Sequence, residues 1–355
     1  MQAYNVEIFD SNYNLIQHSN TNDVSYNVDY LSPVENSIIV PFNPEIANRN
    51  YIRISNSEHE YFGVVSGTDT DKCPDGWIQL RYKPFTTIFD AQIMFDTDLQ
   101  GSATSLEQTL ANIITEYWIS NSDTVQNVPG LTVSTISTTN NWGFNLKSDV
   151  ENMHKCAINF RNVLISRSLS KYRVGLYVIP DFENHTISIE IGVKSADTFY
   201  IEAALPNVIV QNVVINEGSY DVNKLIVYSQ ANMTSTITYY LHPDGTFDTN
   251  NSNRVTPVIF RVVSVSVENT TFADAAADAA AEAFAFDGYK NLIELTVLND
   301  DTLVNPDDMD LGQLVSIISN GVAYPSILTG YEIGKTTKLI FGSIRVDLTK
   351  ILKGA

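Results

Sequence analysis

Alternating apolar and polar positions recur along the chain, and they predict β-strands over most of its length. From residue 1 to about 98 the strands are short, as at Ile38-Ile39-Val40, and clusters of Asn, Pro and Gly separate them. The pattern returns from Ile201, through Leu225-Ile226-Val227-Tyr228 to Leu292-Ile293-Glu294-Leu295-Thr296-Val297. This spacing predicts a mainly β fold of barrels or sandwiches.

A helical period interrupts the strands after Gly101. Thr104 stands three residues before Glu107, as in a capping box, and one apolar face follows at Leu106, Leu110, Ile113, Ile114, Tyr117 and Trp118. A second helix is predicted from Ser148, with Glu151 at the matching position and an inward face of Val150, Met153, Ala157, Phe160 and Leu164. Strands at 174–179 and 187–191 follow, joined through Pro180-Asp181. We therefore expect an α+β domain here.

A further small domain is expected near residue 240. The strand Thr236-Ile237-Thr238-Tyr239-Tyr240 leads into His242-Pro243-Asp244-Gly245, which has Pro and Gly where β-turns favour them. The Ala-rich run from Phe272 to Phe286 predicts a helix that ends at Asp287-Gly288. Acidic residues four apart give this helix a like-charged stripe: Asp274, Asp278 and Glu282. The stripe either faces a channel that carries DNA or is a solvated surface.

Two distant stretches share one β pattern at a constant offset of 263 residues. Tyr51-Ile52-Arg53-Ile54 aligns with Leu314-Val315-Ser316-Ile317, and further matches are Tyr61 with Tyr324 and Gly67 with Gly330. A third strand follows each, at Trp77-Ile78-Gln79-Leu80 and at Leu339-Ile340-Phe341-Gly342. The matches indicate either two unrelated hairpins or a duplicated β-unit. A duplicated unit would let three chains build a ring of six like units, the geometry of a symmetry adaptor.

Composition excludes several classes of protein. The net charge of −20 argues against binding to nucleic acid or anionic membranes, although it suits a wall past which DNA moves without sticking, and it also simply favours solubility. Only 17% of residues are charged, while aromatics reach 10%, which is a polar, β-rich composition. The sequence predicts no signal peptide and no membrane insertion. Cys73 and Cys156 are expected to stay reduced, so the chain is expected to be made in a cytoplasm.

No pattern predicts catalysis or a metal site. The histidines are scattered, and His59-Glu60-Tyr61-Phe62-Gly63 lacks the second histidine of a zinc protease helix. Asp69-Thr70-Asp71 begins like a calcium loop, but Pro74 stands where that loop requires Gly. The turn Asp307-Asp308-Met309-Asp310, like Asp300-Asp301, either binds a divalent ion or is solvated. No catalytic, cofactor-binding or metal-binding residue is assigned.

The order of segments in the last part of the chain resembles a known family. An Ala-rich helix, a strand and an aspartate-rich turn precede Leu311-Gly312-Gln313-Leu314-Val315. The chain then reaches Phe341-Gly342-Ser343-Ile344-Arg345 and Leu348-Thr349-Lys350. With the preceding barrel and inserts, these segments resemble the phage tail hub family: the baseplate hub of contractile tails and the N-terminal module of siphophage tail-associated proteins.

The resemblance implies two tube-like β-barrel domains related by internal duplication, plus two smaller insert domains. The expected division is a first barrel at 1–98, an α+β domain at 99–200, a second barrel at 201–231 with 286–355, and an insert with hairpin and acidic helix at 232–285. Family members of this kind often continue into a fibre or enzyme, whereas this sequence stops at Ala355. A wall-degrading domain is therefore not expected.

The resemblance also implies a function in the virion tail, without enzymatic activity or a cofactor. A homotrimer would form a pseudo-hexameric ring below the hexameric distal tail or tube protein and close or gate the channel through which DNA leaves. Further candidate partners are the tape-measure protein, a spike and receptor-binding proteins, with no sequence-specific contact to nucleic acid.

Two other functions stay open at this point. One is a carbohydrate-binding receptor module, for which the candidate exposed aromatic residues are Tyr13, Tyr26, Tyr30 and Tyr239. The other is a cell-wall hydrolase, whose paired carboxylates need only meet in space.

Overall fold

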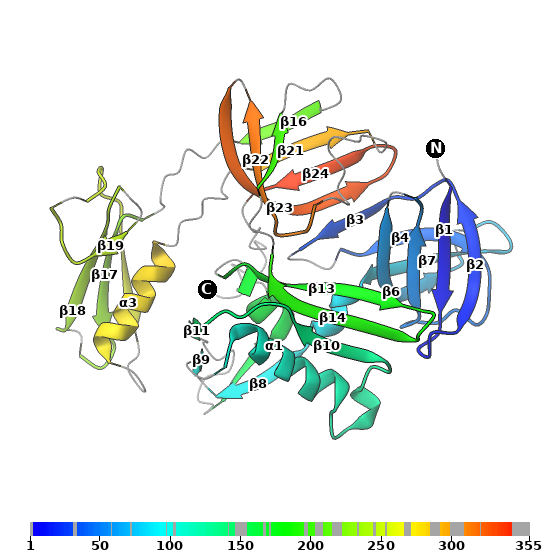
Figure 1. Ribbon diagram of the computed structural model, residues 1–355, viewed down its shortest axis with the longest axis horizontal. Coiled ribbons are helices and arrows are strands. Elements are labelled where there is room, and N and C mark those ends of the chain that lie inside the picture. Colours follow the sequence, from blue (N-terminus) through cyan, green and yellow to red (C-terminus); the bar gives the residue numbers. More distant parts are fainter. Residues whose placement is uncertain are drawn as a thin grey trace. The chain divides into compact units, whose positions relative to one another are not determined.

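The computed structural model describes two compact units (Figure 1). One comprises Met1–Val213 and Leu292–Ala355, and the other Val214–Asn291. Both are mainly β with few helices, which confirms the predicted fold class. None of the described helices is long and apolar enough to cross a membrane. The described residues are 3–30, 34–57, 59–71, 73–96, 98–101, 104–140, 142–145, 155–165, 168–169, 172–194, 198–202, 209–214, 222–232, 234–243, 246–252, 254–265, 271–284, 292–298, 309–319 and 321–342.

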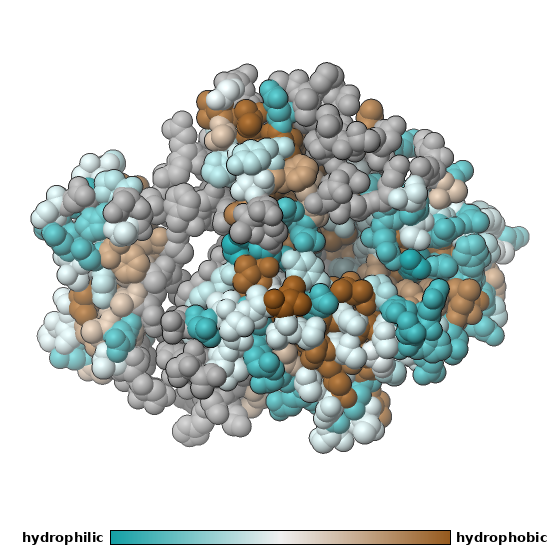
Figure 2. Space-filling model, in the orientation of Figure 1, coloured by the Kyte–Doolittle hydropathy of each residue, from teal (hydrophilic) through white to brown (hydrophobic). Residues whose placement is uncertain are grey.

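The first sheet of the larger unit has six antiparallel strands in the order β2-β1-β5-β6-β7-β4. They are β1 (Tyr4–Phe9), β2 (Leu15–Thr21), β4 (Asn36–Pro41), β5 (Tyr51–Ser55), β6 (Glu60–Asp69) and β7 (Trp77–Pro84). Side chains of β1 alternate between core and solvent as far as Ile8, and none of β2 is fully buried; the surface over these strands is mainly hydrophilic (Figure 2). The inward residues form one core that includes Val6, Ile8, Ile52, Ile54, Leu80 and Tyr82.

The second sheet has the order β15-β22-β23-β24-β21-β16, and β3 also pairs with β23. These strands are β3 (Tyr26–Asp29), β15 (Phe199–Glu202), β16 (Ile209–Val214), β21 (Leu292–Val297), β22 (Leu314–Ser319), β23 (Val322–Ile333) and β24 (Thr337–Phe341). A separate core lies under this sheet and includes Ile201, Ile293, Leu295, Val315, Leu339 and Phe341.

An α+β region lies between the two sheets in sequence. The predicted hairpin is present as β13 (Val174–Asp181) and β14 (Thr186–Val193), and β10 (Leu131–Thr135) adds in parallel to β14. Helix α1 (Leu106–Ile114) continues into the π-helical turn η2 (Thr115–Ile119) and packs on this hairpin sheet. The other elements are η1 (Phe85–Phe89), β8 (Gln92–Asp96), β9 (Asp98–Gly101), η3 (Thr124–Gln126), β11 (Trp142–Asn145), β12 (Lys155–Asn159) and η4 (Phe160–Ile165).

The capping of α1 differs from the prediction. Ser105, not Thr104, is the N-cap, and its hydroxyl accepts from the Gln108 N–H at 3.2 Å. Glu107 turns away from the cap. Its carboxylate accepts from Ser137 Oγ at 2.7 Å and from Thr139 N at 2.7 Å. Glu107 therefore stabilises the segment at 137–139 by hydrogen bonds and does not cap the start of α1.

The predicted second helix is wrong over residues 155–159. These residues form β12, which pairs with β8 through Cys156 and Phe95, so a distant strand satisfies their backbone groups. Helical structure begins only at Phe160, and Phe160 and Leu164 are buried as predicted. The first part of the predicted helix, 148–154, lies outside the described residues.

The described residues of the smaller unit form a four-stranded sheet with one helix on it (Figure 1). Its strands are β17 (Lys224–Ser229), β18 (Thr236–Leu241), β19 (Phe247–Asp248) and β20 (Phe260–Val265). The predicted Ala-rich helix is α3 (Phe272–Ala283), and its Ala276 and Ala280 pack on Leu225 and Val227. Its predicted end at Gly288 lies outside the described residues. The sequence places β17 in the second barrel, but β17 pairs with β18 and β20 and so belongs to this sheet.

Candidate assembly surface

The two large sheets contain the same four-stranded unit. Strands β5-β6-β7-β4 and β22-β23-β24-β21 have the same order, chain sequence and antiparallel directions. Tyr51 pairs with Val64 in the first unit, and Leu314 pairs with Ile327 in the second, so the offset of 263 residues holds on both strands. The repeat in the sequence is therefore a repeat in backbone pairing.

The repeat extends to irregular backbone features. A β-bulge falls between Val65 and Gly67 in β6, and another between Leu328 and Gly330 in β23. Just before β5 and just before β22, a residue with positive φ donates its N–H to the carbonyl of the residue ahead of the bulge, at 2.8 Å. In the first unit Arg49 (φ 75°) donates to Val65, and in the second Gly312 (φ 90°) donates to Leu328. Unrelated hairpins would have no reason to share these features.

The turns that lead into β5 and β22 are also closed in the same way. The Asn50 side chain accepts from the Ala47 N–H at 2.5 Å, and the Gln313 side chain accepts from the Asp310 N–H at 3.1 Å. A buried apolar residue precedes each turn, at Ile46 and at Met309. Asp310 of the aspartate-rich turn thus lies at a structural turn, while Asp300, Asp301, Asp307 and Asp308 lie outside the described residues.

The third strands align differently from the prediction. Thr68 pairs with Leu80, and Tyr331 pairs with Leu339, so Leu80 corresponds to Leu339 at an offset of 259 residues. The sequence alignment of Leu80 with Gly342 is therefore wrong. The cause is a connection between β6 and β7, at 70–76, that is four residues longer than the one at 334–336 between β23 and β24.

The two units differ in the strand outside them. Strand β1 runs antiparallel to β5, with Val6 opposite Ile54, whereas β15 runs parallel to β22, with Ile201 opposite Ile317. The duplicated part is therefore the four-stranded unit, and the strand added beyond it is specific to each half.

Strand β3 joins the two sheets within the chain. It lies beside β23 (Figure 1), with Val28 opposite Tyr331 and Tyr26 opposite Ile333, and Tyr30 donates its N–H to the Thr329 carbonyl at 3.0 Å. Tyr331 and Ile333 pack into the core of the first sheet, where Ile333 is fully buried. The strands cross closely, because a Cβ on Gly330 would lie 2.8 Å from the Val28 carbonyl oxygen.

The matching edge of β6 has no such strand. Ser66, Gly67, Thr68 and Asp69 correspond to the segment of β23 that β3 covers, but in the described part of the chain this segment pairs only with β7. At Gly67 the nearest group is the guanidinium of Arg81, 2.6 Å from where a Cβ would lie. Arg81 is half exposed and lies 3.9 Å from Glu35, which also accepts from Ser66 Oγ at 2.8 Å.

A cavity of about 530 Å³ lies within the larger unit. Lys194 lines it, is only 3% exposed, and places Nζ 3.2 Å from the centre of the Tyr177 ring. Burial lowers the pKa of Lys194 to about 8, and the nearby Asp310 opposes this shift. Burial also raises the pKa of Tyr177 to about 12, with a further contribution from Asp310. The Lys194 ammonium group therefore lies between the β13–β14 hairpin, which carries Tyr177, and the turn before β22, which carries Asp310.

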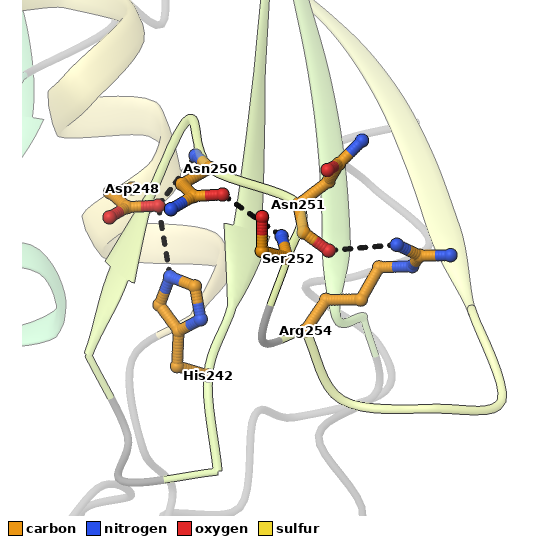
Figure 3. Close-up of polar contacts among 6 residues, drawn as sticks. All are labelled: His242, Asp248, Asn250, Asn251, Ser252 and Arg254. Carbon is orange, nitrogen blue, oxygen red and sulfur yellow. Dashed lines mark hydrogen bonds and ion pairs between the residues drawn. The ribbon is translucent and has the colours of Figure 1, made fainter.

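The smaller unit carries a polar loop that the sequence analysis missed (Figure 3). His242 Nε2 lies 2.9 Å from Asp248 Oδ1, which also accepts from the Asn250 N–H at 2.6 Å. Asn250 accepts in turn from the Ser252 N–H at 2.9 Å, and Arg254 donates to the Asn251 carbonyl at 2.8 Å. The hydrogen bond with His242 and that from Asn250 lower the pKa of Asp248. The run of Asp and Asn, typical of Asx-turns, was the signal for this loop.

Only one residue of the predicted acidic stripe can be placed. Asp274 is exposed in the first turn of α3, where its N–H donates to Thr271 Oγ1 at 3.2 Å and its carboxylate accepts from the same hydroxyl at 2.5 Å. The side chains of Asp278 and Glu282 lie outside the described set. Asp274 is thus part of a helix cap, and a channel-facing role for the stripe stays a prediction.

The tyrosines considered for carbohydrate binding are not exposed platforms. Tyr13 and Tyr26 are buried, and the Tyr13 hydroxyl donates to the Pro129 carbonyl. Tyr30 donates to the Ile165 carbonyl at 3.3 Å, and Tyr239 packs edge-on against Phe247. Tyrosines at strand spacing are more often core or interface residues, and these four follow that pattern, since Tyr13 and Tyr26 fill cores while Tyr30 and Tyr239 are partly buried. The described residues also hold no cluster of side chains suited to a metal ion.

Comparison with known proteins shows the fold. No model of a known family and no curated protein matches the sequence. The structure is similar to the 43 kDa tail protein of prophage MuSo2 from Shewanella oneidensis (TM-score 0.56, 12% identity, 96% of this chain and 98% of that one). It is also similar to the tail protein from Neisseria meningitidis MC58 (TM-score 0.56, 11% identity, 96% of each chain). A chain of the lidded Francisella PdpA-VgrG complex matches with TM-score 0.50 and 9% identity, over 96% of this chain and 52% of that one. The chain therefore has the fold of phage tail proteins, as the resemblance in its sequence predicts.

Proposed function

We propose that this chain is a structural protein of a phage baseplate or tail tip. Three copies form a pseudo-hexameric ring below a hexameric distal tail or tube protein, and the ring closes or gates the DNA exit channel. The observation that carries the proposal is the repeated four-stranded unit, with its shared register, bulge and turn. Two like units in each of three chains supply six similar positions for a six-fold partner.

Two further observations support this function. The tail proteins from Shewanella oneidensis and Neisseria meningitidis match this chain over nearly its full length. A fold alone does not fix a function, so these matches add weight only together with the repeat. The net charge of −20 also disfavours contact with DNA phosphates, as a channel wall requires.

The test is the mass and shape of the purified chain in solution. Light scattering should give three times the chain mass of 39.5 kDa, and negative-stain images of the same peak should show a central hole with a six-fold-like outline. The measurement is repeated with the phage's own tube or distal tail protein added. A monomer under both conditions would refute the ring, and saturable binding to host wall glycan or turnover of wall material would then favour a receptor module or a hydrolase.

A further inference from the structure

We propose that the free edge of β6 accepts a strand from a second copy of this chain. This inference rests on the proposed ring and specifies its interface between chains. The acceptor is the segment from Ser66 to Asp69, and the donor is β16 of the neighbouring copy. The pairing repeats between two chains the contact that β3 and β23 make within one.

The duplication identifies the acceptor. Gly67 corresponds to Gly330, and Thr68 corresponds to Tyr331. In the second sheet, this segment pairs with β24 on one side and with β3 on the other. In the first sheet, the same segment pairs with β7 on one side, and in the described structure no strand covers the other. An uncovered edge offers backbone N–H and C=O groups to an added strand.

Ring closure identifies the occupant as another copy. A ring of six sheets has six junctions, and one chain makes a single junction through β3. The remaining junctions therefore lie between chains, head to tail, as a closed heterologous ring requires. Each of them brings the second sheet of one chain to the first sheet of the next.

The position of β16 identifies the donor strand. Beside the first sheet, β3 lies next to β4 through a side-chain contact: Asn36 accepts from the Asn27 N–H at 2.8 Å and donates to the Asn27 carbonyl at 3.0 Å. In the second sheet the counterpart of β4 is β21, and β16 lies next to it. Strand β16 therefore has the place in the second unit that β3 has in the first.

The chemistry of the β6 edge suits a contact that forms after folding. Tyr331 and Ile333 are packed into a core, whereas the corresponding Thr68 and Thr70 are exposed. Threonine is β-branched and polar, so it favours an extended strand without creating an apolar patch. The guanidinium of Arg81 lies over Gly67, at the position that corresponds to the crossing of β3 over Gly330. Its ion pair with Glu35 is exposed and contributes little to stability, so Arg81 can move aside at small cost in free energy.

The first experiment is disulfide trapping in the full-length chain. On a Cys73→Ser and Cys156→Ser background, Thr68→Cys chains are mixed with chains that carry one cysteine at a position in β16, Ile209–Val214. Oxidation should give disulfide-linked dimers of one chain of each kind, strongest at alternate positions of β16. The matched control is Val28→Cys with Tyr331→Cys, which should form a disulfide within one chain.

The outcomes separate this inference from the function on which it rests. Trimers that form but yield no link from Thr68→Cys to any β16 position, while the control links, would overturn the inference alone. A chain that stays monomeric, with or without the tube partner, would overturn the ring and the interface together.

A pair of glycine variants tests the same edge without cysteines. The three atoms nearest to a Cβ at Gly67 all belong to the flexible end of Arg81, which can move aside, so Gly67→Ala should leave the melting temperature of the monomer unchanged. The added Cβ should obstruct the crossing strand and weaken trimer formation by about tenfold or more. Gly330→Ala, which meets the Val28 backbone at 2.8 Å, should instead lower the melting temperature. Trimerisation of Gly67→Ala as tight as that of the unchanged chain would overturn the crossing.

Discussion

Replacing Ile333 by alanine tests whether the two large sheets are joined through the end of β23. Ile333 belongs to the second sheet by pairing, yet it is fully buried in the core of the first. Its duplicate, Thr70, is exposed at the edge of the first sheet. The two positions therefore form a matched pair, one at a closed junction and one at an open edge.

The expected loss of stability follows from the buried carbon atoms. Ile333→Ala removes three of them, worth about 0.8 kcal/mol each, or about 2.4 kcal/mol of transfer free energy. The cavity left behind adds to this, so we expect a loss of about 3 kcal/mol in the free energy of unfolding. Thr70→Ala removes an exposed side chain and should change that free energy by less than about 0.5 kcal/mol.

Urea unfolding, followed by intrinsic tryptophan fluorescence, measures both variants. Ile333→Ala should lower the midpoint by about 1 M for a slope of about 3 kcal/mol per M and leave that slope unchanged, and Thr70→Ala should overlay the unchanged chain. Equal midpoints for the two variants would show that Ile333 does not fill the core of the first sheet, and the closed junction would then lose its structural basis.

Three other changes should affect stability locally. Because the folded pKa of Lys194, about 8, lies below the ordinary 10.5, the folded state binds fewer protons between these values, so stability should rise with pH across that window. This rise in the free energy of unfolding is at most about 3 kcal/mol, and Lys194→Met should abolish it. Urea unfolding below pH 8 and near pH 10.5 measures the difference. Glu107→Ala should lower the free energy of unfolding by about 2–4 kcal/mol, because the donors at Ser137 and Thr139 lose their acceptor. A decrease no larger than that from replacing an exposed glutamate by alanine would contradict these contacts. Thr271→Ala should cost about 1 kcal/mol by removing the α3 cap, seen as a lower melting temperature, whereas Thr271→Ser should restore it.

The sequence predicted the repeat because local alternation and turn chemistry determine it. Tyr51 and Leu314 begin strands whose apolar residues alternate, and a shift by one residue would turn those side chains into solvent. The bulges and the turns at Asn50 and Gln313 were not foreseen, although the constant offset was their signal. The third-strand alignment failed because it depends on loop length, which the apolar pattern does not report.

The predicted features that failed depend on distant partners. Residues 155–159 have helical spacing, but β8 supplies a strand for them to pair with, and tertiary pairing outweighs propensity. The assignment of β17 failed because its two partners, β18 and β20, follow later in the chain. The junction between β3 and β23 joins residues about 300 positions apart, which no local pattern reveals.

The opposite directions of β1 and β15 determine how many copies of a partner could bind the proposed ring. Around such a ring the four-stranded units would repeat six times, but antiparallel and parallel outer strands would alternate, three of each. A protein that contacts only the repeated units would bind in six copies, whereas one that contacts β1 or β15 would bind in three. The divergence of one outer strand would thus let the same ring present six-fold symmetry to one neighbour and three-fold symmetry to another.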